Sequence, residues 1–80
     1  MVSEIPEEGV ITDELRKLAS IATDMQLSSK MRFQAIDQLG DMASHESLLV
    51  LLNLVANDKM NTEERDRALK RAREIVKKGR

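Results

Sequence analysis

Residues 48–55 read Leu48-Leu49-Val50-Leu51-Leu52-Asn53-Leu54-Val55, and this apolar run decides how the chain folds. A helix with seven apolar residues in eight is apolar on every side, which is typical of a helix buried on every side. The run is also far shorter than the roughly 18 residues that a membrane span needs. We therefore expect this helix at the centre of a small domain, where Leu51→Ala or Leu52→Ala costs about 2 to 5 kcal/mol of unfolding free energy.

The apolar positions of this run have counterparts 33 residues earlier in the chain. A shift of 33 residues matches four identical pairs: Leu15 with Leu48, Leu18 with Leu51, Arg32 with Arg65, and Ala35 with Ala68. The conservative pairs are Ala22 with Val55, Asp24 with Asn57, Ser29 with Thr62, Ile36 with Leu69, and Met42 with Ile75. This spacing predicts two copies of a helical pair, each of which buries its apolar face against the next.

Four helices are expected, over residues 12–25, 29–43, 45–57 and 62–78, with Thr12, Ser28 or Ser29, Ser44 and Thr62 as N-caps. Gly40 interrupts the second helix at a cost of about 1 kcal/mol relative to alanine, so we expect a neighbouring helix to approach closely there. Residues 1–11 combine acids with Pro6 and Gly9 and show no periodicity, which predicts a flexible acidic arm. Residues 12–80 form one helical domain of two repeats, 12–44 and 45–78.

A longer pattern covers residues 12–78: Met31-Arg32-x-x-Ala35-Ile36-x-x-Leu39-Gly40-x-Met42, then Leu48-x-x-Leu51-Leu52-x-x-Val55-x-Asn57-Asp58, then Arg65-x-x-Ala68-Leu69. It resembles HEAT repeats, and more narrowly the short HEAT-like repeats of the phycobilisome lyase type. The resemblance implies an all-α fold of two HEAT-like hairpins, arranged as a short right-handed α-solenoid or a four-helix bundle. It also implies a structural ladder of ion pairs between the repeats. The arginines would be those that open the second helix of each pair, Arg32 and Arg65. The aspartates would be those near the end of the first helix, Asp24 and Asp58.

The period of 33 residues lies closer to ankyrin and tetratricopeptide repeats, but neither alternative fits the residues. The chain has no Thr-Pro-Leu-His motif, and Phe33 is its only aromatic residue. Two repeats are fewer than the three that a solenoid normally needs. The exposed end is therefore either tolerated by a monomer or covered in a homodimer, and we weigh these two states equally.

The composition excludes several kinds of chemistry. Without cysteine there is no disulfide, thiolate metal site or cysteine nucleophile, and without tryptophan or tyrosine there is no platform for stacked bases. His45, the single histidine, is expected to be a solvated first-turn residue. Asp37 and Asp41 lie one turn apart and could pair as acid and base, but the residues around them offer no apolar environment for such chemistry, so a solvated face is favoured. We predict no catalytic residues, no metal site, no cofactor and no enzymatic activity.

Charge is distributed unevenly along the chain. Residues 1–14 carry −5, residues 15–59 are balanced and residues 60–80 carry +4. Six cations of the last helix could bind phosphates: Arg67, Lys70, Arg71, Arg73, Lys77 and Lys78. We favour the alternative that Asp37, Asp41 and Glu74 balance them as ion pairs. A third possibility is that the acidic arm folds back over this basic helix and screens it.

Together these observations favour a small non-enzymatic protein–protein interaction module or adaptor. Its partner would bind a ridge on the second and fourth helices: Gln34, Asp37, Gln38, Asp41, Arg67, Lys70 and Arg71. The alternative function is nucleic-acid binding through the basic C-terminal helix. No secretory signal or membrane segment is visible, which favours a cytoplasmic protein with no membrane partner.

Overall fold

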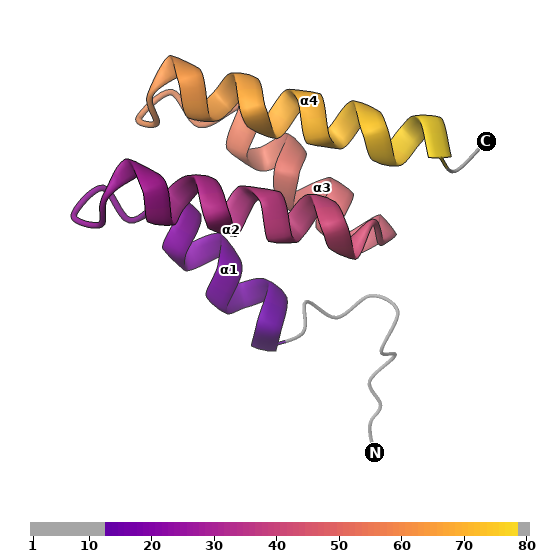
Figure 1. The fold of residues 1–80 in the computed structure, drawn as a ribbon, viewed down its shortest axis with the longest axis horizontal. Coiled ribbons are helices and arrows are strands. Elements are labelled where there is room, and N and C mark those ends of the chain that lie inside the picture. Colours follow the sequence, from indigo (N-terminus) through magenta and orange to yellow (C-terminus); the bar gives the residue numbers. More distant parts are fainter. Residues whose placement is uncertain (1–12, 79–80) are drawn as a thin grey trace.

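The computed structural model describes residues 13–78, and this range contains four helices and no strand. The helices are α1 (Asp13–Thr23), α2 (Ser29–Met42), α3 (His45–Val55) and α4 (Thr62–Lys78), as Figure 1 shows. The all-α fold class and all four helices are confirmed, although α1, α2 and α3 end one or two residues earlier than expected. Thr12 and the acidic arm over 1–11 lie outside the described residues.

Serine side chains start two of these helices. Ser28 has an extended backbone, and its side chain accepts a hydrogen bond of 3.2 Å from the backbone N–H of Met31. Ser44 and Ser47 form a reciprocal capping box, in which each side chain accepts from the backbone N–H of the other at 3.0 and 2.9 Å. Such caps satisfy N–H groups that have no partner within the helix, so the predicted N-caps at Ser28 and Ser44 are confirmed. The fourth prediction is wrong by one position, because Thr62 is already the first residue of α4.

The connection between α1 and α2 and the connection between α3 and α4 are closed by the same hydrogen bonds, 33 residues apart. Asp24 Oδ1 accepts from the backbone N–H of Gln26, and Asn57 Oδ1 accepts from that of Lys59, both at 3.0 Å. Three backbone bonds also recur at this offset, from Asp24, Leu27 and Arg32 in the first connection and from Asn57, Met60 and Arg65 in the second. Since an amide oxygen accepts this bond as an aspartate oxygen does, Asn57 replaces Asp24 without a change in the turn.

The four helices enclose one aliphatic core. α1 packs mainly on α2, α3 packs on α4, and α2 lies beside α4, while α3 also contacts α1 and α2 (Figure 1). The buried apolar residues come from all four helices and from the second connection: Leu15, Leu18, Ala22, Ala35, Ile36, Leu39, Val50, Leu51, Leu54, Met60, Ala68, Ala72 and Ile75. The residues that match at an offset of 33 therefore lie mainly in this core.

The expectation that α3 is buried on every side is wrong for one side of the helix. Leu51 is fully buried and Leu54 is 3% exposed, but Leu49 and Leu52 are 47% and 44% exposed. The covered side faces α1, α2 and α4, and no helix among residues 13–78 covers the other side. The large loss of unfolding free energy expected for Leu52→Ala is therefore wrong, because this side chain is 44% exposed. The loss expected for Leu51→Ala remains a prediction, because Leu51 is fully buried.

Candidate functional site

The predicted ridge on α2 and α4 is largely an internal network of ion pairs. Arg67 Nη1 donates to both oxygens of Asp37 at 2.9 and 2.8 Å. Arg71 Nη1 donates to Asp37 at 3.1 Å, and Arg71 Nη2 donates to Asp41 at 2.7 Å. The hydrogen bond to Asp41 raises the pKa of Arg71 above its ordinary value, and Asp37 adds to this effect while partial burial opposes it. The other predicted ridge residues, Gln34, Gln38 and Lys70, are exposed.

Glu74 and Phe33 also contact the two arginines of this network, and Gly40 leaves room for one of them. An ideal Cβ on Gly40 would lie 2.5 Å from Arg71 Nε and 2.7 Å from its Cζ, so only a glycine leaves room for this guanidinium. The predicted packing reason for Gly40 is thus found, but the group that approaches is the guanidinium of Arg71 and not the backbone of a neighbouring helix. Arg71 Nε also lies 3.0 Å from Glu74 Oε1, and the Arg67 guanidinium lies 5.1 Å from the centre of the Phe33 ring.

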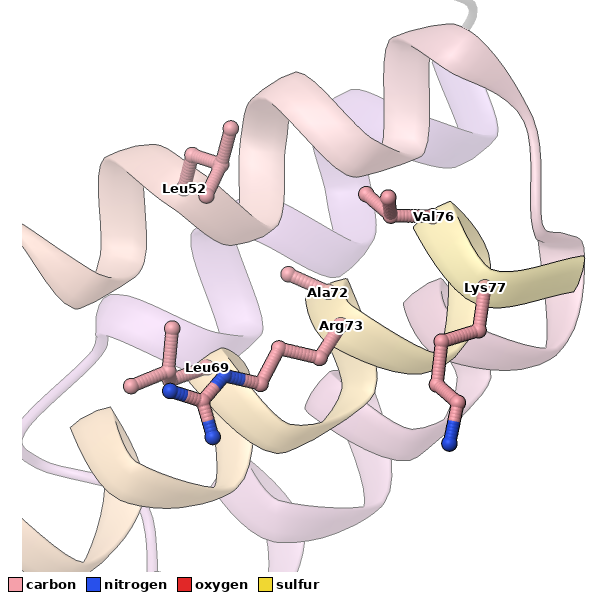
Figure 2. Close-up of a pocket in the computed structure, with 6 residues that line it drawn as sticks. All are labelled: Leu52, Leu69, Ala72, Arg73, Val76 and Lys77. Carbon is pink, nitrogen blue, oxygen red and sulfur yellow. The ribbon is translucent and has the colours of Figure 1, made fainter. Parts of the chain in front are cut away.

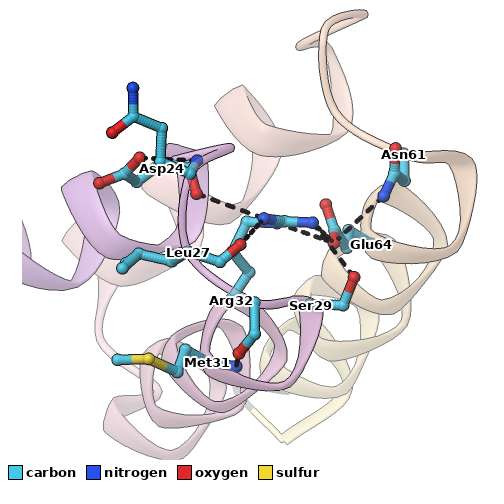
Figure 3. Close-up of polar contacts among 9 residues, drawn as sticks. Asp24, Leu27, Ser29, Met31, Arg32, Asn61 and Glu64 are labelled. Atoms are coloured by element: carbon cyan, nitrogen blue, oxygen red, sulfur yellow. Dashed lines mark hydrogen bonds and ion pairs between the residues drawn. The ribbon is translucent and has the colours of Figure 1, made fainter.

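A second ion pair, Arg32 with Glu64, is buried between α2 and α4 (Figure 3). The two side chains are 5% and 1% exposed. Glu64 Oε2 accepts from Arg32 Nε at 2.8 Å and lies 2.7 Å from Arg32 Nη2. The remaining guanidinium N–H groups reach the carbonyls of Asp24 and Leu27 and the hydroxyl of Ser29. Four hydrogen bonds and the ion pair therefore hold this buried cation, as burial of a charge requires.

This geometry corrects the expected ladder between arginine and aspartate side chains. Arg32 bonds the backbone carbonyl of Asp24, while the Asp24 carboxylate closes the turn. Arg65 Nε donates to the carbonyl of Val55 at 2.9 Å, and Asp58 is exposed with no ion pair among residues 13–78. Glu64, an acid in the first turn of α4, supplies the anion instead. The position of Arg32 in an apolar stripe was the signal that a buried anion must exist.

An open apolar groove lies between α3 and α4 on the side that no other described helix covers. Its volume is about 290 Å³, and it is lined by Leu52, Leu69, Ala72, Arg73, Val76 and Lys77. Figure 2 shows the aliphatic side chains of Leu52, Leu69 and Val76 around the hollow, with Arg73 and Lys77 extending from α4. Val76 is 50% exposed, so this groove is an accessible apolar surface with a basic rim. We call these six residues the α3–α4 groove.

Sequence reasoning missed the α3–α4 groove because it placed Leu52 in the core. The available signal was the uniform apolarity of residues 48–55, which gives α3 more apolar surface than two helical pairs can cover. The remaining hollows are less apolar; one on α1 is lined by Asp13, Arg16, Lys17, Ser20 and Ile21.

The features expected of an enzyme or a membrane protein can be examined over residues 13–78. No group of three or more His, Asp or Glu side chains in this range could hold a metal ion, and His45 is exposed. No helix in the same range combines the length and the apolarity needed to cross a membrane. Asp37 and Asp41 both face arginines of α4.

The chain was compared with models of protein families, with curated proteins and with solved structures, and none of the three comparisons gives a match.

Proposed function

We propose that this protein is a small, non-enzymatic protein–protein interaction module built from two HEAT-like repeats. The observation that carries the proposal is the α3–α4 groove, where three large aliphatic side chains line a hollow next to two cations. A domain of this size has little apolar surface to spare from its core, so the exposed Leu52 and Val76, next to the half-buried Leu69 around one hollow, indicate a binding surface. Leu49, 47% exposed on α3, adds to the apolar surface of that helix.

The repeat assignment is supported by the turns. Side-chain and backbone hydrogen bonds recur 33 residues apart in the two connections, and in each helical pair an arginine near the start of the second helix bonds a backbone carbonyl of the first helix or its connection. Helical repeats of this kind display surface rather than carry out reactions.

The ridge on α2 and α4 is the weaker candidate for the binding surface. Asp37, Asp41, Arg67 and Arg71 bind one another, so a charged partner would have to replace ion pairs that already exist. The apolar side chains of the α3–α4 groove, by contrast, would favour binding, because burial of apolar surface by a partner stabilises the complex by about 25 cal/mol per Å².

The proposal is tested by affinity capture from a lysate of the source cell, with the full chain as bait and bound proteins quantified by mass spectrometry. We expect defined proteins that are retained by the wild type and by Leu49→Ser but lost with Leu52→Ser. Both variants replace a half-exposed leucine of α3, and only Leu52 lines the hollow. Absence of any specifically retained protein would contradict an interaction module.

Nucleic-acid binding is the second candidate, because α4 carries exposed cations that make no ion pair within residues 13–78. These are Lys70, Arg73, Lys77 and Lys78, whereas Arg67 and Arg71 are bound to aspartates. Fluorescence anisotropy with random duplex DNA and single-stranded RNA at low salt tests this candidate. Binding that falls steeply as salt rises would support it, and a flat titration at tens of micromolar protein would remove it.

A further inference from the structure

Building on the proposed function, we propose that the occupant of the α3–α4 groove is an acidic amphipathic helix of a partner protein. It would pack against α4 as α4 packs against α2. The apolar side of the helix would cover Leu52, Leu69 and Val76, and acidic side chains beside it would face Arg73 and Lys77.

The 33-residue offset supports a helix as the occupant. Leu69, which lines the groove and is only half-buried, corresponds to Ile36 of α2, which is fully buried. Ala72, which is 2% exposed, corresponds to the buried Leu39. α2 lies between α1 and α4, whereas α4 has a described helical neighbour only on the α2 and α3 side. The surface of α2 that α4 helps to cover therefore has an equivalent on α4 that remains open, and its shape suits one more helix.

The charges around the groove determine the chemistry of that helix. Arg73 and Lys77 line the groove itself. A neighbouring hollow of about 350 Å³ shares both residues and Leu69 and also includes Lys70 and two acids, Asp66 and Glu74, the second of which lies beside Arg71. At the corresponding positions of α2, Asp37 and Gly40 stand in place of Lys70 and Arg73. On α2, Asp37 binds arginines of the next helix, α4. The corresponding surface of α4 carries Lys70 and Arg73, so a helix that packs there would need acidic residues.

Arg65 adds a third position where an acid fits. Its counterpart Arg32 is neutralised by Glu64 from the next helical pair, at 2.7 Å. Within residues 13–78 no carboxylate lies within ion-pair distance of Arg65, which has only a carbonyl bond to Val55. A helix that packs on α4 would bring an acidic residue to Arg65 as Glu64 is brought to Arg32.

The same charges disfavour a second copy as the occupant. A symmetric pair of α3–α4 grooves would place Arg73 and Lys77 of both copies in one interface, and juxtaposed like charges oppose association. The face of α1 around Arg16 and Lys17 sets these two cations against the single acid Asp13, so stacking of one copy on the next brings little complementary charge to Arg73 and Lys77. A partner with acidic residues avoids both conflicts.

The experiment is an NMR titration of the full ¹⁵N-labelled chain with two designed helical peptides of about 18 residues, or five turns. Both carry the same leucine and alanine stripe; one has glutamate beside the stripe and the other has lysine at the same positions. We expect the glutamate peptide to shift the amide signals of Leu52, Leu69, Ala72 and Val76, and to bind about tenfold more tightly than the lysine peptide. Its affinity should fall as salt is raised, because the rim charges are exposed.

Matched variants make the result specific to the groove. Leu52→Ser and Arg73→Glu should each weaken binding of the glutamate peptide severalfold. Leu49→Ser and Lys59→Glu, which change an exposed leucine and an exposed cation elsewhere, should leave binding unchanged. Equal binding of the two peptides, or no shift of the groove signals at millimolar peptide, would overturn the proposed occupant.

Three further outcomes would assign the groove to something else and so would also overturn the proposal. Stronger peptide binding after Glu4, Glu7 and Glu8 are changed to glutamine would show that the chain's own acidic arm occupies it. A dimer in light scattering that Leu52→Ser dissolves would identify a second copy, and displacement of the peptide by duplex DNA would identify a nucleic-acid site. If captured proteins remain bound to Leu52→Ser, this inference fails while the interaction module still stands.

Discussion

The buried pair of Arg32 and Glu64 yields the largest predicted effect of a single substitution. Glu64→Ala removes the only anion within residues 13–78 that contacts the Arg32 guanidinium, which is 5% exposed, although the bonds to two carbonyls and Ser29 remain. Removal of one partner from such a pair costs about 3 to 5 kcal/mol, because the other charge is left buried and uncompensated. Since a domain of this size is stabilised by only about 3 to 5 kcal/mol, we expect Glu64→Ala to be largely unfolded at 25 °C.

Glu64→Gln provides a variant that can be measured. It keeps the shape of the side chain and one acceptor oxygen but loses the charge, so we expect a cost of about 1.5 to 3 kcal/mol. Arg65→Met is the matched control. Arg65 is the counterpart of Arg32 in the second helical pair, but it bonds only a backbone carbonyl and no carboxylate within residues 13–78. Loss of that single hydrogen bond should cost about 0.5 to 1.5 kcal/mol.

The double variant Arg32→Met with Glu64→Leu completes the test. It leaves no buried charge uncompensated but removes the donor to the carbonyls of Asp24 and Leu27, so we expect it to cost clearly less than the sum of its two single changes. Urea unfolding followed by far-UV circular dichroism gives all of these free energies, and with a single phenylalanine as its only aromatic residue the chain offers no better optical probe. A cost below about 1 kcal/mol for Glu64→Gln, or a double variant as unstable as the sum of its single changes, would refute the role assigned to this pair.

Three other substitutions have expected outcomes that the same unfolding measurement checks. Ala43→Gly should stabilise the domain by about 0.5 to 1 kcal/mol, because Ala43 ends α2 with a left-handed φ of 51° that glycine adopts without strain; a loss of stability would contradict this. Gly40→Ala should stabilise the Arg71→Ala variant by about 1 kcal/mol but stabilise the wild type clearly less, because the new Cβ displaces the Arg71 guanidinium; equal effects in the two backgrounds would argue against that contact. Leu51→Ala should cost about 2 to 5 kcal/mol and Leu52→Ala less than half as much, as their exposures of 0% and 44% require, and similar costs would place Leu52 in the core.

Periodicity and capping residues were sufficient to predict the helices. Ser28 and Ser44 lie at their starts because a hydroxyl next to free backbone N–H groups is a local requirement that a short segment reveals. The 33-residue offset likewise recurs in the turns, where Asp24 and Asn57 make the same bond. Local chemistry of this kind does not depend on how the helices are assembled.

The α3–α4 groove depends on how the helices are assembled and so was missed. The pattern of residues 48–55 says that α3 is apolar all round, but whether a neighbour covers Leu52 depends on how many helices the chain supplies. The charge pattern did name Asp37, Asp41 and Glu74 as the acids that balance the cations of α4. Which of the six cations they bind, Arg67 and Arg71, became clear only with the helices side by side.

Photo-crosslinking tests most directly whether the protein binds another protein through the α3–α4 groove. A photoreactive phenylalanine analogue is placed in the full chain at Leu52 or, as the comparison, at Gln38 on the ridge, and both proteins are irradiated in the source cell. Both positions are exposed, so either substitution leaves the core intact. We predict a discrete adduct to a second protein from position 52 and none from position 38. An adduct from position 38 alone, or the same adduct from both positions, would contradict binding through the groove.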